Sequence, residues 1–175
     1  NLPPLDGNYV SPQQSHALYA SGIIITNASH DPFLQNQPPP PPGGSQTHSF
    51  GSRVRGQIST DGGATFQNFI VPNANATVQV TSSQDVGPTR FFNTEMLSLN
   101  LQGGTLPAGV MVRESPSKAS LGRTSVRTTA AGYAIDSFFD IFTELSTDGG
   151  VTWSPGVTHP GTMGLSTNPP PGIPP

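Results

Sequence analysis

Hydrophobic and polar positions alternate with a period of two through the central part of the chain. Phe50, Val54 and Ile58 share one face of such a pattern, whereas Arg53 and Arg55 share the other. This alternation is typical of strands that bury one face. It recurs, with Gly and Pro turn signals in between, at 78–80, 96–101, 110–112 and 124–129. We therefore predict an all-β fold, a single β-sandwich of the jelly-roll or immunoglobulin-like kind, with about eight to ten short strands.

The segment 134–145 (AIDSFFDIFTEL) allows two interpretations. Ile135, Phe138 and Phe142 have the spacing of an amphipathic helix. As a strand, the segment places Ile135 and Phe139 on one face, and Phe138 and Phe142 on the other face among acidic residues. We predict a strand, because a tight-turn motif follows the segment directly.

That motif is a repeat. Residues 59–66 (STDGGATF) recur as 146–153 (STDGGVTW), and both copies fit S-x-D-x-G-x-T-[F/W], the Asp-box pattern. The Gly pair allows a tight hairpin turn, and the Asp, Ser and Thr side chains can bond the turn. The expected turn residues are Ser59, Asp61, Gly62, Gly63, Thr65 and Phe66, and then Ser146, Asp148, Gly149, Gly150, Thr152 and Trp153. The chain is too short for a six-bladed sialidase propeller, so we interpret the copies as corners of one sandwich.

Most of the 20 prolines lie in the flanks of the chain. We predict an N-terminal arm over 1–44, a β-sandwich body over 45–166 and a proline-rich tail over 167–175. Within the arm, 16–27 is a candidate strand, and 38–42 is five consecutive prolines that should form a polyproline II rod.

The arm's candidate strand is apolar and must be buried. It either pairs within its own sheet or adds to a sheet edge of a neighbouring subunit. The candidate subunit interface consists of Leu18, Tyr19, Ile23, Ile24 and Ile25.

Composition limits the possible partners and compartments. The net charge is −3 and only 10% of the residues are charged, so a nucleic-acid partner is disfavoured. No apolar run approaches the length of a membrane helix. Cysteine is absent, which excludes disulfides and thiol chemistry. The chain begins with Asn1, which suggests a removed secretion signal. With its low charge and many Ser and Thr residues, we expect an extracellular or cell-surface protein.

Catalytic and metal-binding signals are sparse. The four histidines, His16, His30, His48 and His159, have no metal-ligand spacing and no nucleophile motif beside them. We predict no enzyme activity, no metal and no cofactor. Asp136, Asp140 and Glu144 share one predicted strand face and could hold calcium, although solvated or arginine-paired acids are the commoner case.

Two further features concern glycans. The segment 113–127 holds four of the basic residues and could receive an anionic polysaccharide, or it could be a polar loop with an internal Arg–Glu pair. Asn27 and Asn75 begin N-x-[S/T] sequences and are the candidate glycosylation sites.

A wider resemblance covers roughly residues 22–165. It rests on THSFGSRV, STDGGATF, FFNTEMLSL, LPAGVMVRESPSKASLGRTSVR and GYAIDSFFDIFTELSTDGGVTWSP. This run resembles a family of secreted bacterial proteins that often carry C-terminal exosortase (PEP-CTERM) sorting tails. The resemblance implies export and a place at the cell surface, and it implies no reaction. The chain lacks the sorting tail.

Two functions follow as hypotheses. The first is a structural subunit of an extracellular filament or surface layer, a homopolymer joined through the N-terminal strand. The alternative is a carbohydrate-binding surface module that uses Trp153, Tyr133 or Phe138 to bind a surface polysaccharide.

Overall fold

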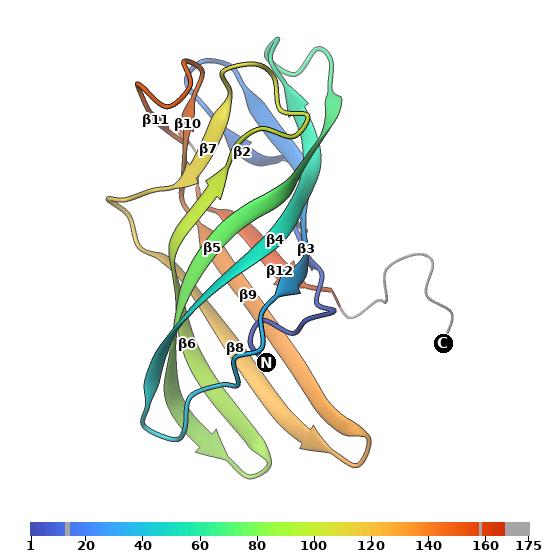
Figure 1. Ribbon diagram of the computed structural model, residues 1–175, viewed down its shortest axis with the longest axis vertical. Helices are drawn as coiled ribbons and strands as arrows, with labels where there is room; N and C mark the ends of the chain where they lie inside the picture. Colours follow the sequence, from blue (N-terminus) through green and yellow to red (C-terminus); the bar gives the residue numbers. More distant parts are fainter. Residues whose placement is uncertain (13–14, 158, 167–175) are drawn as a thin grey trace.

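The computed structural model describes residues 1–12, 15–157 and 159–166, and every regular element in this part of the chain is a β-strand (Figure 1). The strands are β1 (Tyr9–Val10), β2 (Ser15–Leu18), β3 (Ile24–Leu34), β4 (Ser45–Ser59), β5 (Gln67–Val86), β6 (Thr89–Leu101), β7 (Met111–Glu114), β8 (Ser120–Thr129), β9 (Gly132–Ile141), β10 (Thr143–Ser146), β11 (Ser154–Pro155) and β12 (Gly161–Leu165). The prediction of an all-β chain is confirmed.

The strands form one sheet that closes into a barrel rather than the two separate sheets of the predicted sandwich. The order β6-β5-β4-β3-β1-β12-β9-β8 is continuous, and β8 pairs with β6 to complete an eight-strand ring. Closure pairs most of the strand edges that a sandwich would leave free. The described residues contain no helix that is long and apolar enough to cross a lipid bilayer.

Four positions around the ring hold a single strand of 11 residues or more, and the other four hold two strands in succession. β3, β4, β5 and β6 are the long strands. β7 and β8 both lie beside β6, and β1 and β2 both lie beside β3. β9 and β10 are separated only by Phe142, and β11 and β12 lie beside them. This division accounts for twelve strands where fewer were predicted.

The strand prediction for the Phe-rich segment is confirmed. β9 and β10 bury Phe139, Ile141 and Leu145 in the barrel, whereas Phe138 faces outward and is exposed. In β6 the simple alternation fails at Leu97, which is 44% exposed while its neighbours in the pattern are buried. The register between β5 and β6 shifts at this point, so Leu97 is the extra residue of a β-bulge.

The predicted N-terminal arm belongs to the barrel. The structure therefore corrects the predicted separation of arm and body at residue 44. The expected strand over 16–27 is instead the end of β2, a turn and the start of β3. β3 pairs with β4 over most of its length.

The candidate subunit interface is used within the chain. Tyr19, Ile23 and Ile25 are buried in the chain's own core, and Leu18 and Ile24 are half-buried in the same hairpin. The Tyr19 hydroxyl lies 2.6 Å from Oγ1 of Thr143, which is on β10. These side chains are therefore already packed without a second subunit.

The lower part of the barrel in Figure 1 is open on one side. β3 stops pairing with β4 at Leu34, and β12 pairs with β9 only from Phe138 onward. The polyproline segment connects β3 to β4 here and packs against the barrel. Pro40 is fully buried, and its carbonyl accepts a 2.7 Å hydrogen bond from Arg90 Nη2. The predicted tail over 167–175 lies outside the described residues.

Candidate binding hollow on the outer face

The outer face of β6, β8 and β9 carries a hollow of about 360 Å³ in the lower part of the barrel, which we call the outer hollow. Side chains on these strands alternate between the barrel interior and the outer face. Phe92 and Thr124 point inward and are buried, so their sequence neighbours Phe91, Asn93 and Arg123 point outward. Ser83 and Gln84 add a margin where β5 bulges against β6.

Strand register arranges the hollow as two rows of side chains. Asn93, Arg123 and Phe138 are neighbours across β6, β8 and β9. In the next outward-facing row, Phe91, Ser125 and Asp136 are neighbours across the same strands. Two aromatic rings thus lie at opposite corners of a small surface whose other members are polar.

Most of the polar side chains that line the outer hollow have no protein partner. Thr124 and Ser137, which are buried, bond each other at 2.7 Å. Among the described residues, no side-chain hydrogen bond or ion pair involves the six others, which are Ser83, Gln84, Asn93, Arg123, Ser125 and Asp136. By contrast Arg53, Arg55, Arg90 and Arg113 each contact a carboxylate. An exposed polar group without an internal partner remains free to bond a ligand.

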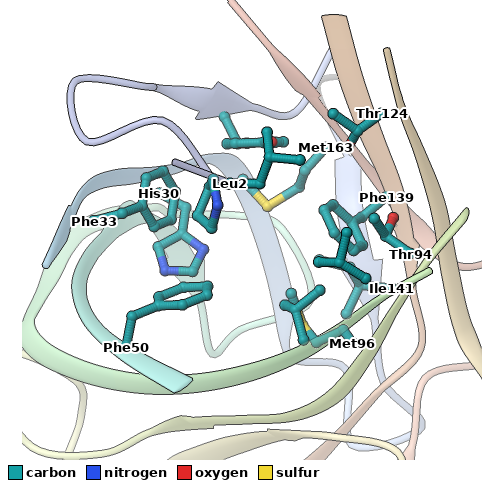
Figure 2. Close-up of a pocket in the computed structure, with 14 residues that line it drawn as sticks. Leu2, His30, Phe33, Phe50, Thr94, Met96, Thr124, Phe139, Ile141 and Met163 are labelled. Atoms are coloured by element: carbon teal, nitrogen blue, oxygen red, sulfur yellow. The ribbon is translucent and has the colours of Figure 1, made fainter. Parts of the chain in front are cut away.

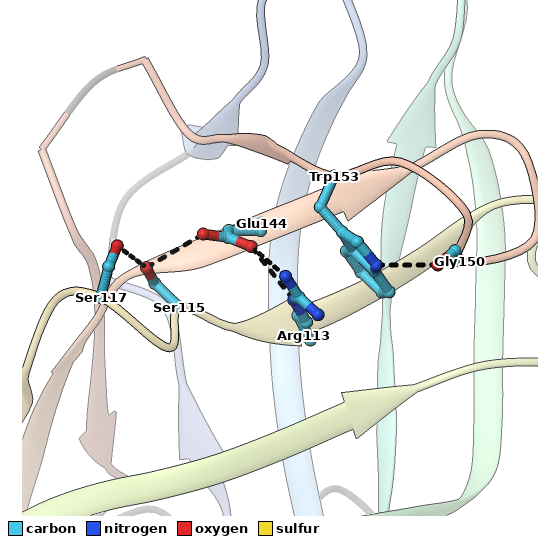
Figure 3. Close-up of polar contacts among 6 residues, drawn as sticks. All are labelled: Arg113, Ser115, Ser117, Glu144, Gly150 and Trp153. Carbon is cyan, nitrogen blue, oxygen red and sulfur yellow. Dashed lines mark hydrogen bonds and ion pairs between the residues drawn. The ribbon is translucent and has the colours of Figure 1, made fainter.

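A second arginine on the outer face, near the top of the barrel, is fully engaged (Figure 3). Arg113 donates two hydrogen bonds to Glu144 Oε2, at 3.0 and 2.7 Å, and its guanidinium lies 4.1 Å from the centre of the Trp153 ring. The Trp153 indole N–H donates to the Gly150 carbonyl at 3.0 Å, and Ser115 donates to Glu144. We call Arg113, Glu144 and Trp153 the arginine clasp.

A larger open groove of about 580 Å³ lies on the outer face of β3, β4 and β5. Several of its polar side chains are bonded within the protein. Asn27 donates to Gln57 at 2.7 Å, and Gln57 donates to Asn68 at 3.2 Å. Arg55 donates to Asp31 at 2.6 Å. The groove is therefore less suited to a polar ligand than the outer hollow.

The barrel interior is nearly filled. Two cavities of about 30 Å³ each remain, and His30, Ile141 and Met163 line both of them. Figure 2 shows the lower one, where Leu2 of the N-terminal segment lies among the core side chains beside His30. A cavity of this size holds one or two water molecules, and organic ligands need several hundred Å³. The interior formed by the described residues is therefore a packed core.

His30 is a titratable side chain that is buried in that core. Burial lowers its pKa from 6.5 to about 4, against the opposing effect of the neighbouring Asp31 carboxylate. Its Nε2 lies 2.5 Å from Ser52 Oγ, and its ring contacts Phe33. His30 is thus a neutral, hydrogen-bonded core residue. Of the other histidines, His48 bonds the Leu2 carbonyl, His159 is exposed, and the side chain of His16 lies outside the described residues.

The two repeated turns have matching hydrogen-bond networks at the same end of the barrel (Figure 1, top). In the first turn, Ser59 donates to Asp61, and Thr65 donates to Asp61 through both its N–H and its hydroxyl. The Gly63 N–H donates to Ser59 Oγ at 2.8 Å.

The second turn repeats these four contacts. They join Ser146, Asp148, Gly150 and Thr152. The Gly residues at both turns have positive φ: Gly62, Gly63, Gly149 and Gly150.

Bonds from the Thr side chain are the main cause that lowers the pKa of the turn carboxylates. For Asp61 the pKa falls to about 2, and that of Asp148 also falls, with Thr152 as the main donor. The aromatic positions differ between the copies, because Phe66 is 43% exposed rather than packed beneath its turn, whereas Trp153 belongs to the arginine clasp. These networks are internally complete and serve the turns.

The remaining predicted site residues are scattered. The exposed Asn27 bonds Gln57, and the exposed Asn75 lies on β5. In the described part of the chain, no three His, Asp or Glu side chains gather as they would around a metal ion. The three acids proposed as a calcium alternative are separate: Asp136 is in the outer hollow, Asp140 accepts a hydrogen bond from Thr162, and Glu144 pairs with Arg113.

Comparison with known proteins adds no relative: no protein-family model, no curated protein and no solved structure matches the chain. The sequence had singled out Arg123, Asp136 and Phe138, each for a different reason. It missed Phe91 and Asn93, although period-two alternation in β6 could have placed them on the outer face. The neighbourhood of these five residues follows only from the pairing of β6 with β8.

Proposed function

We propose that the protein is a carbohydrate-binding module and that the outer hollow is its glycan site. The observation that carries this proposal is the set of unpartnered polar side chains between two aromatic rings. A sugar ring presents an apolar face of C–H groups and an edge of hydroxyls. Phe91 and Phe138 offer surfaces for the apolar face. Asn93, Arg123 and Asp136 offer the donors and acceptors that hydroxyls need.

The shape of the site favours an extended polymer over a small enclosed molecule. The outer hollow is open, and its strands carry outward-facing side chains above and below it. An open surface of this kind binds through several weak contacts, many of them mediated by water. We therefore expect binding of polysaccharides rather than free monosaccharides.

An extracellular location is part of the same proposal. Its support is the resemblance of the paired STDGG turns and their flanking strands to secreted bacterial proteins. A filament joined through the N-terminal strand is not favoured, because Ile23 and Ile25 are already buried in the chain's own barrel.

Affinity electrophoresis against a panel of neutral and acidic polysaccharides tests the proposal. Binding to one or more of them is expected, and Arg123→Gln or Phe138→Ala should weaken it about tenfold, which corresponds to roughly 1.4 kcal/mol.

Two matched variants serve as controls. Phe66→Ala removes an aromatic ring that is 43% exposed, close to the 41% of Phe138, at the other end of the barrel. Arg127→Gln removes the same charge from the same strand outside the hollow. Equal losses in the variants and their controls, or no binding to any polymer, would overturn the proposal.

A further inference from the structure

The lower end of β9 is a free sheet edge at the open lower part of the barrel. Residues 132–139 pair with β8 on one side. On the other side, β12 pairs with β9 only from Phe138 to Ile141, so 132–136 have no strand partner among the described residues. Tyr133 on this edge is 74% exposed. An unpaired strand of this kind is a template for another strand.

The turn between β8 and β9 determines which backbone groups are unpaired. The two strands are joined by a two-residue turn, Ala130-Ala131, so Thr129 and Gly132 form the closing, hydrogen-bonded pair. Hydrogen-bonded and non-hydrogen-bonded pairs then alternate along an antiparallel ladder. It follows that the N–H and C=O groups of Tyr133 and Ile135 point away from β8, toward the free edge.

We infer that this edge pairs with the same edge of a second copy, which gives a symmetric dimer joined through β9. In the register centred on Ala134, each Tyr133 lies opposite the partner's Ile135 in a hydrogen-bonded pair. The two Ala134 residues meet in a non-hydrogen-bonded pair on the two-fold axis. This register satisfies the free groups of both strands, and its two aromatic–β-branched pairs are a favourable cross-strand combination. Twofold symmetric contacts are also the commonest in homo-oligomers.

Self-pairing fits the chemistry of the edge. Within 132–136 the single charged residue is Asp136, which would lie opposite the partner's Gly132 and not opposite another charge. The edge carries no Lys or Pro to block strand addition. The chain's own C-terminal residues 167–175 are a poor occupant, because five of them are prolines, which cannot donate to a strand ladder.

A cysteine at the two-fold axis tests the inference in a chain that has no cysteine of its own. Non-hydrogen-bonded antiparallel pairs bring Cα atoms about 4.5 Å apart, within the range of a disulfide. Under mild oxidation, Ala134→Cys should give about tenfold more covalent dimer than Val151→Cys, which places a thiol on an exposed turn at the opposite end of the barrel. Equal dimer from both variants would overturn the inference.

A second pair of variants tests the backbone contacts without a cross-link. Tyr133→Pro removes an N–H from the free edge and none from the β8 ladder, so the barrel should still form and the dimer should be lost in concentration-dependent ultracentrifugation. Tyr133→Val keeps the N–H and introduces a β-branched side chain, which is favourable in strands, so it should retain the dimer. The same sedimentation for wild type and Tyr133→Pro would contradict the inference. If Ala134→Cys cross-links only after removal of 167–175, the tail and not a second copy covers the edge, which also contradicts it.

Discussion

The arginine clasp and the outer hollow contain the same three kinds of side chain in different states. Each has an arginine, a carboxylate and an aromatic ring on the outer face of the barrel. In the clasp, Arg113 is bonded twice to Glu144 and stacked on Trp153. In the hollow, Arg123 has no ion pair among the described residues, although Asp136 and Phe138 lie on the adjacent strand. The same chemistry serves the fold in one place and is available to a ligand in the other.

Register produces this difference. Arg113 and Glu144 are direct cross-strand partners on β7 and β10, so their charged ends meet. Arg123 has Asn93 and Phe138 as its direct partners, and Asp136 lies diagonally, one row away. Direct neighbours across a ladder interact strongly, and diagonal ones are several Å farther apart. Whether a polar residue stabilises the protein or remains free thus depends on which residue lies opposite.

The core residue His30 adds to the comparison a polar group that is enclosed by the protein. Its protonation gives the largest expected effect on the free energy of unfolding. His30 has a pKa of about 4 in the folded state, below the unfolded value of 6.5. The unfolded chain therefore binds a proton first as pH falls. Stability is full above pH 6.5 and declines until pH 4, and the shift corresponds to about 3 kcal/mol. Urea unfolding near pH 7 and near pH 4 measures this loss.

The variant His30→Gln isolates that contribution, since glutamine is polar and does not titrate. Its unfolding free energy should change less between pH 6.5 and 4 than that of the wild type. The other titrating groups are the same in both proteins, so their contributions cancel in the comparison. Burial raises the pKa of Glu114, which changes stability in the opposite direction. The lowered pKa of Asp61 and of Asp148 begins to cost stability only as the pH approaches the unfolded value of 3.8, at the lower end of the window. If the unfolding free energy of His30→Gln depends on pH as steeply as that of the wild type, His30 is not the group that makes stability sensitive to acid.

The arginines themselves give a smaller effect that separates the two regions directly. Arg113→Gln leaves Glu144, whose side chain is only 12% exposed, without its cation and removes the stacking on Trp153. After allowance for the partly exposed guanidinium, the cost is about 1–2 kcal/mol in urea unfolding. Arg123→Gln should stay within about 0.5 kcal/mol of the wild type, because it breaks no contact. Equal losses of unfolding free energy in Arg113→Gln and Arg123→Gln would contradict the distinction between the arginine clasp and the outer hollow.

Local features could be predicted from the sequence to a large extent. The repeated STDGG turns occur where they were expected, and the strand assignment of the Phe-rich segment before the second turn is confirmed. Both depend on residues close in sequence. Gly pairs permit positive φ, and Ser, Asp and Thr two to four residues apart can bond one another whatever the rest of the chain does.

Features that depend on distant pairing could not be predicted in this way. Barrel closure needs β6 to pair with β8, and the break at Phe142 lets one stretch of chain pair with different partners above and below it. The bulge at Leu97 breaks the alternation for a reason that lies on β5. The sequence also indicated an Arg–Glu pair within 113–127, whereas Arg113 pairs with Glu144 on another strand. The free state of Arg123 follows from the same long-range register.

Amide chemical-shift mapping by nuclear magnetic resonance, with fragments of a polysaccharide that the protein binds, tests the central claim most directly. If the unpartnered side chains of the outer hollow hold the glycan, the largest shifts should fall on Asn93, Arg123 and Phe138 and their neighbours on β6, β8 and β9. The amides around Arg113 and Trp153 should stay in place. Shifts centred on the arginine clasp or on the groove over β3, β4 and β5, with none in the hollow, would contradict the account.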